Sequence, residues 1–130
     1  DHVIDYGKED FARAVRTITK KRGADIVVEH VGAATWEGSV RSLARHGRLV
    51  TCGATAGHEV ALNLRLLFFK SLSLLGSTMG SRGEFVEIVR HFEEGRLRPV
   101  VDRVLPLGEI REGHRLLEGR EVFGKVVLVP

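Results

Sequence analysis

The chain has 130 residues, of which 43% are hydrophobic and 28% are charged, and its formal net charge is +3. This composition is typical of a soluble globular domain, and scattered basic residues with few aromatics between them argue against a nucleic-acid-binding protein. No apolar run approaches the roughly 20 residues that span a bilayer, and the first residues lack the pattern of a secretory signal, so we expect a cytoplasmic protein without membrane contact.

The first half of the chain alternates between strand and helix patterns. Residues 2–6 (HVIDY) predict a short strand, and apolar residues then recur at helical spacing from Phe11 to Ile18. The unbroken apolar run ADIVVEHV (24–31) predicts a strand buried on both faces of a parallel sheet. A second helical stripe begins at Trp36 and is expected to end at Gly47.

The same rhythm continues to residue 78. GRLVTCG (47–53) predicts a buried strand, NLRLLFFK (63–70) a short helix, and SLSLLGST (71–78) another strand. Strands and helices that alternate in this way are typical of a doubly wound α/β sheet.

The pattern changes in the second half of the chain. Ser81 and Glu84 have the spacing of a capping box, and the helix that follows is expected to end at Gly95. PVVDRVLPL (99–107) is bounded by prolines and fits an edge strand. A helix near 109–118 and a terminal strand GKVVLV complete the chain, and we expect a domain boundary near Gly76.

Three predicted strands end in a glycine, in HVG (30–32), CGAT (52–55) and GSTMG (76–80). Ligands bind outside the carboxyl ends of parallel strands, and glycine allows a ligand to approach the backbone closely. Each glycine alone is more readily explained as a turn or helix-cap residue. Their recurrence after successive strands predicts one edge across which an extended ligand, such as a dinucleotide, binds.

In order along the chain, DHVIDY, ADIVVEHVG, GRLVTCGAT, SLSLLGSTMGSRGEF and GKVVL resemble the medium-chain dehydrogenase/reductase family, with its zinc-type alcohol dehydrogenases and quinone reductases. The resemblance implies a Rossmann-type doubly wound parallel sheet that lacks its first two strands. Residues 1–76 would be the later part of the nucleotide-binding domain, and residues 77–130 the segment that returns to the catalytic domain.

The resemblance also implies a site for NAD or NADP. His30, Val31 and Gly32 would lie beside the adenosine half of the cofactor, with Val31 against the adenine or ribose. Cys52, Gly53 and Ala54 would reach its middle and the nicotinamide end. The remaining expected contacts are Leu75, Gly76 and Ser77 at the nicotinamide and Lys125 at the pyrophosphate, although Lys125 is equally well explained as a solvated lysine.

Metal binding and acid–base catalysis by these residues are not expected. The six histidines have no metal-ligand spacing, so any zinc of the full-length enzyme would be bound elsewhere. Cys52 is expected to be a buried, inert thiol. Glu29 and His30 are adjacent on a strand, so their side chains point to opposite faces and cannot act together. Glu29 is therefore interpreted as structural or as support for the site.

We expect an oxidoreductase that moves hydride between nicotinamide and a small alcohol, aldehyde or ketone, with this part binding the cofactor. A non-catalytic nucleotide-binding or interaction module, an NADPH:quinone reductase of the same family, and a methyltransferase that uses S-adenosylmethionine remain alternatives. Fifteen Arg against five Lys, one Asn and no Gln are a weak indication of a thermophilic source.

The glycine-rich turn GxGxxG of the family and the first two strands of its sheet are not found in the sequence. We therefore expect a fragment of a longer enzyme, inactive alone and unable to close the native sheet. SLSLL has no charge that would protect a sheet edge. Leu72 to Leu75 are accordingly expected to pair in a homodimer or tetramer.

Overall fold

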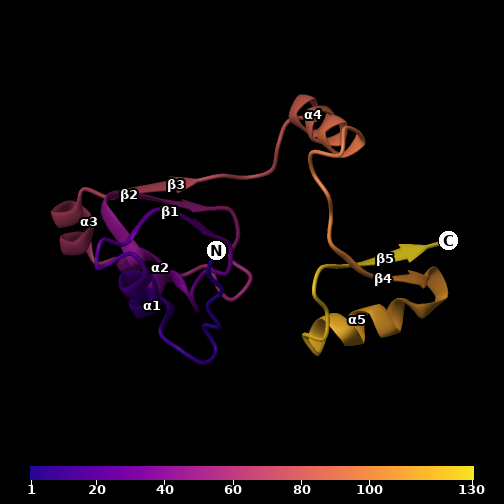
Figure 1. Cartoon of the computed structure of the whole chain (residues 1–130), viewed down its shortest axis with the longest axis horizontal. Coiled ribbons are helices and arrows are strands. Elements are labelled where there is room, and N and C mark those ends of the chain that lie inside the picture. Colours follow the sequence, from indigo (N-terminus) through magenta and orange to yellow (C-terminus); the bar gives the residue numbers. More distant parts are fainter. The chain divides into compact units, whose positions relative to one another are not determined.

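A computed structural model describes all residues from 1 to 130 (Figure 1). The chain forms two compact units, Asp1–Met79 and Gly80–Pro130, each with its own parallel sheet. The division falls three residues after the Gly76 boundary expected from the sequence. The assignment of these units to a nucleotide-binding domain and a returning segment stays a prediction.

The first unit alternates helices and strands, as the apolar periodicity predicts. Its three strands are parallel and adjacent in chain order, β1-β2-β3. Helix α2 packs against β1 and β2 of this sheet, and α1 lies beside α2 (Figure 1). The elements are α1 (Phe11–Ile18), β1 (Ala24–Glu29), α2 (Trp36–Ser42), β2 (Leu43–Thr51), α3 (Leu64–Lys70) and β3 (Ser73–Gly76). The α/β parallel architecture expected from the sequence is confirmed.

The register of the three strands determines which residues face the hydrophobic core and which residues end the strands at a common edge. Val27, Leu49 and Leu74 are aligned across the sheet, and this row packs with α2 in the hydrophobic core. Leu49 has no exposed surface. Two residues further along, Glu29, Thr51 and Gly76 are aligned in the same way, so the three strands end together.

The other face of the sheet is uncovered within the first unit, so burial of ADIVVEHV on both faces is wrong for this unit. Val28, Val50 and Leu75 form the aligned row on that face. Val28 is 68% exposed and Leu75 is 47% exposed. The helices that contact the strands, α2 and α3, pack on the opposite face with Leu49.

Two boundaries also differ from the sequence predictions. Residues 2–6 form no strand, since no neighbouring strand is available to pair with their backbone groups. Helix α2 ends at Ser42, and Leu43 already pairs with β1. Gly47 lies inside β2, where a side chain would come within 2.9 Å of a backbone carbonyl, so it marks an irregularity of the strand and not a helix end.

The second unit contains a βαβ arrangement in which β4 and β5 are parallel and α5 connects them. Its elements are α4 (Arg82–Glu93), β4 (Val101–Pro106), the 3-10 turn η1 (Leu107–Glu109), α5 (Ile110–Glu118) and β5 (Lys125–Val129). The capping box is confirmed, because Ser81 and Glu84 each accept a backbone hydrogen bond from the other.

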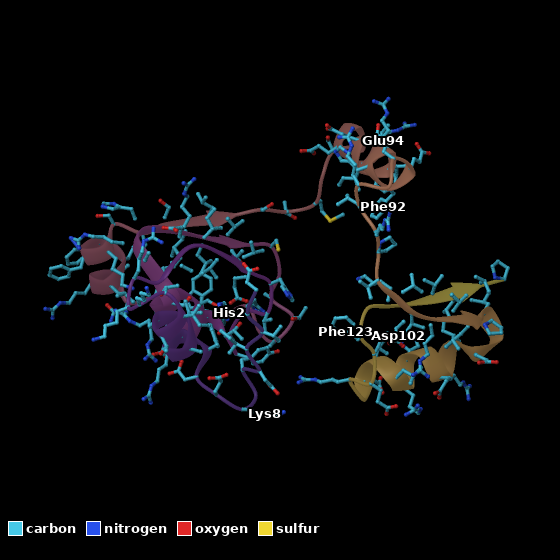
Figure 2. The ribbon with its side chains drawn as sticks, in the orientation of Figure 1. His2, Lys8, Phe92, Glu94, Asp102 and Phe123 are labelled. Atoms are coloured by element: carbon cyan, nitrogen blue, oxygen red, sulfur yellow. The ribbon has the colours of Figure 1, made fainter.

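The turn before β5 is fixed to β4. The Phe123 N–H donates to the Asp102 carboxylate at 3.1 Å, and the two labelled residues lie close together in Figure 2. The hydrogen bond lowers the pKa of Asp102, with a second contribution from Arg103. None of the helices in either unit has the length and apolar character needed to cross a membrane.

Candidate functional site

The carboxyl-terminal edge of the β1-β2-β3 sheet brings three candidate segments together. The Cys52 N–H donates to the Glu29 carbonyl at 3.0 Å, and the Ser77 N–H donates to the Thr51 carbonyl at 2.9 Å. The loop after β2 continues back over the loop after β1, where the Ala56 N–H donates to the Val31 carbonyl at 2.7 Å. Segments 30–32, 52–54 and 75–77 therefore lie on neighbouring strands at one edge.

Lys125 belongs to the second unit and is not a residue of the β1-β2-β3 sheet. It begins β5 in the second unit, where its backbone N–H donates to the Val100 carbonyl at 2.9 Å. Its contact with a pyrophosphate stays a prediction. All the other candidate residues, from His30 to Ser77, belong to the first unit.

At Gly32 and Gly53, contacts within the chain leave no room for a side chain. Gly32 has a φ of +89°, and a side chain there would collide with the carbonyl of Gly57. A side chain at Gly53 would come within 2.8 Å of the His30 carbonyl. These two glycines let the loops after β1 and β2 pack against each other, so close approach of a ligand is not needed to explain them.

Gly76 differs from these two glycines. A side chain built on it meets no atom within 4 Å, and its φ is not in the left-handed region. It ends β3, an edge strand of the sheet, and the residue is exposed. Nothing inside the chain requires a glycine at this position, so the space in front of Gly76 is open to a ligand or to another chain.

The Glu29 carboxylate is buried at the same edge, with only 3% of the residue exposed. Its Oε1 accepts hydrogen bonds from Val31 N (2.7 Å), Gly32 N (3.1 Å) and Thr35 Oγ1 (3.0 Å). Its Oε2 accepts from Ser39 Oγ at 2.5 Å and from Thr35 Oγ1 at 2.9 Å. One carboxylate therefore ties the end of β1 to the first turns of α2.

This arrangement also determines the charge of Glu29. Burial by itself raises the pKa of Glu29, but the hydrogen bonds that its carboxylate accepts outweigh burial and hold the pKa below its ordinary value. The carboxylate is therefore ionised at neutral pH. None of the salt bridges of the chain includes it.

The residues beside Glu29 face outward. His30 is exposed while Glu29 is buried, as expected for neighbours on a strand, so the two do not form an acid–base pair. Cys52 is exposed, and the prediction of a buried thiol is wrong. It follows Thr51, the last residue of β2.

The edge is open and not an enclosed pocket. A shallow cavity of about 220 Å³ includes His30, Val31 and the Glu29 network. Typical pockets for small molecules measure about 300–1,000 Å³. A ligand at this site would thus lie across the strand ends, mostly outside that cavity.

A family model described as zinc-binding dehydrogenase matches residues 1–128, almost the whole chain. The chain belongs to the zinc-binding dehydrogenase family. This membership confirms the resemblance of the sequence to the medium-chain dehydrogenases and reductases. The fold agrees with it.

Three similar proteins extend this result. An NAD-dependent alcohol dehydrogenase of Saccharolobus solfataricus is 28% identical over 131 residues, which cover 100% of this chain and 38% of the relative. A quinone oxidoreductase of Pseudomonas aeruginosa is 32% identical, over 98% of this chain and 42% of the relative. A crystal structure of an NAD-dependent alcohol dehydrogenase has a TM-score of 0.86 and 47% identity, over 100% of this chain and 38% of that one. The chain thus spans 38% to 42% of the length of these proteins.

The family description implies a zinc ion, but the residues of this zinc-binding dehydrogenase chain do not fit one. No three His, Cys, Asp or Glu side chains come together in a group that could hold a metal. Cys52, the one thiol, lies at the strand edge without such partners.

Proposed function

We propose that this chain supplies the cofactor-binding part of an oxidoreductase that moves hydride between NAD or NADP and a small alcohol, aldehyde or ketone. Relatives named NAD-dependent alcohol dehydrogenase cover the whole chain and support this proposal. The observation that carries it is the open strand edge at Gly76, next to the loops after β1 and β2.

The open edge suits the nicotinamide end of the cofactor. The Ser77 N–H donates to the Thr51 carbonyl, so this N–H points toward β2. Backbone groups on the outer side of an edge strand have no partner within the sheet. Those of Gly76 are free to bond a flat carboxamide, and the absence of a side chain lets the ring approach.

The other segments would contact the rest of the cofactor. Val31 would pack against the adenine or ribose, with His30 and Gly32 beside it. Cys52, Gly53 and Ala54 would lie along the middle of the dinucleotide. The cofactor supplies the hydride chemistry, and the residues of this chain orient the ring and hold its position.

Substitution of Gly76 tests this placement in the native gene product. We expect Gly76→Ala and Gly76→Val to weaken NADH or NADPH binding progressively, with Val raising Kd by about tenfold or more, because a side chain would overlap the ring. Gly108→Ala is the matched control, since a side chain at Gly108 also meets nothing within 4 Å. Cofactor fluorescence on titration measures the Kd. Equal binding by all variants would contradict the placement.

A quinone substrate is a second candidate, which the quinone oxidoreductase of Pseudomonas aeruginosa supports. Turnover of the native gene product with benzyl alcohol and NAD(P), compared with a quinone and NADPH, distinguishes the two. Cofactor binding without turnover of either class would favour a non-catalytic nucleotide-binding module.

We also propose that β3 pairs with a second copy of the chain to give a homodimer or tetramer. It is the edge strand of the sheet, and Leu72 to Leu75 carry no charge. Ser73, in the middle of this segment, is exposed. An unprotected edge of this kind is stabilised when another strand covers it.

A further inference from the structure

The Glu29 network controls which groups the turn after β1 can offer to a ligand. The N–H groups of Val31 and Gly32 both donate to Glu29 Oε1. Backbone N–H groups at a strand-to-helix turn are common donors to phosphate or other anions. Here they are directed inward, so neither is available to a bound cofactor.

The same network fixes the conformation of the turn. The N–H groups of Thr35 and Trp36 donate to the Gly32 carbonyl at 3.0 and 2.9 Å. The hydroxyl groups of Thr35 and Ser39 donate to Glu29 from the α2 side. The turn is thereby held from both of its ends, with a carboxylate as the common acceptor.

We propose that Glu29 is a positioning residue for the cofactor: it fixes the turn at residues 31–35 so that Val31 and Gly32 meet the cofactor by packing and not through their N–H groups. This inference rests on the proposed function. Glu29 does not itself touch the cofactor. Without its carboxylate, two N–H groups and two hydroxyl groups at the edge lose their acceptor, and the turn can adopt other conformations.

A purely structural role would have a different consequence. If Glu29 only stabilised the start of α2, its loss would lower the melting temperature and leave cofactor binding intact wherever the protein is still folded. A positioning role changes the affinity for the cofactor at temperatures well below melting. At saturating cofactor the turnover changes little, because the nicotinamide lies at Gly76 and not at this turn.

The experiment compares Glu29→Gln and Glu29→Ala in the native gene product with Glu37→Gln, an exposed glutamate on α2, the helix that the Glu29 carboxylate contacts. The glutamine oxygen still accepts from Val31 and Gly32, so we expect Kd and KM for NADH or NADPH to rise by about threefold for Gln. For Ala we expect a rise of about thirtyfold, since all four donors lose their partner. The control should match the unsubstituted protein, and kcat should stay within about twofold in all variants.

Two results would overturn the inference, and they are distinguishable. If both Glu29 variants melt at lower temperature but bind the cofactor as the unsubstituted protein does, Glu29 is structural only and the proposed function stands. If the unsubstituted protein binds neither NADH nor NADPH, the proposed function fails, and this inference fails with it. If Glu29→Ala does not fold, the Kd of Glu29→Gln is compared with that of Glu37→Gln. Equal values would overturn the inference.

Discussion

Glu29 is a buried charge that neutral donors stabilise, without a cationic partner. A buried carboxylate is costly unless it is fully hydrogen-bonded. Here the donors come from two backbone N–H groups and from the hydroxyl groups of Thr35 and Ser39. The sequence allowed Glu29 to be interpreted as a supporting residue. Thr35 and Ser39 were missed as its partners, because their contact depends on how α2 packs on β1.

The lowered pKa of Glu29 predicts how stability depends on pH. A carboxyl group whose pKa is lower in the folded state stabilises the fold above its ordinary pKa of 4.5, and this contribution is lost as the pH falls through the lower, folded-state value. At pH 7 we expect Glu29→Gln to lower the free energy of unfolding by about 1–2 kcal/mol. Below pH 4 the difference should shrink, since a protonated carboxyl group resembles an amide.

Urea unfolding of the two proteins at pH 7 and at pH 3 measures this difference. The control is Glu37→Gln, whose side chain is exposed and which should show almost no difference at either pH. A loss of stability in Glu29→Gln that is equal at both pH values would contradict the account.

At the scale of elements, periodicity was informative where an element is complete within the chain. The stripe from Phe11 to Ile18 and the capping box at Ser81 predicted α1 and α4 correctly. The start of β2 was missed, because the pattern of α2 runs into Leu43 without a breaker and Gly47 resembles a helix stop. The prediction of a strand at residues 2–6 was wrong for another reason: a strand forms only when another strand pairs with it, and none does so here.

The edge strand β3 gives a prediction at this scale. Ser73→Lys places a charge in the middle of the uncharged edge, where Ser73 is exposed, so it should block strand pairing between copies without disturbing the core. Leu74 is unsuitable for this purpose, because it packs against the core. We expect light scattering of the native gene product to show a smaller assembly for Ser73→Lys.

Arg45→Lys is the control for Ser73→Lys, because it keeps an exposed positive charge on the neighbouring strand β2. Lysine at Ser81 would not serve as a control, because Ser81 caps α4. Arg45→Lys should leave the assembly unchanged. A monomer in the unsubstituted protein, or an unchanged assembly in Ser73→Lys, would refute pairing through β3.

At the scale of the whole molecule, the chain buries few large side chains. Its buried hydrophobic residues are Ala12, Val40, Leu43, Ala44, Leu49 and Leu116. Within the first unit the row with Val28 and Leu75 has no cover, and the predicted strand at residues 2–6 has no partner strand. A core of this size contributes little against the conformational entropy of 130 residues.

We therefore expect the isolated 130-residue chain to unfold without a cooperative transition. Differential scanning calorimetry should show a broad, low-enthalpy signal, and the chain should bind NADH or NADPH weakly or not at all. A sharp transition whose calorimetric and van't Hoff enthalpies agree, together with tight cofactor binding, would show that the chain is a self-sufficient domain.

The common edge of the strands was predictable from the sequence, whereas the causes of its glycines were not. Parallel strands that follow one another place their carboxyl ends together, so segments 30–32, 52–54 and 75–77 could be assigned to one edge. The loop contacts that require Gly32 and Gly53 come from Gly57 and His30, 25 and 23 positions away, and no local pattern indicates them. Only Gly76 keeps the open space that the sequence suggested for all three.

A crystal structure of the native gene product with bound NADH or NADPH tests the central claim most directly. We expect the nicotinamide in front of Gly76, the adenosine half beside Val31, and the Val31 and Gly32 N–H groups still bonded to Glu29. A cofactor bound at the amino-terminal ends of β1, β2 and β3, or one that contacts none of these segments, would contradict the account.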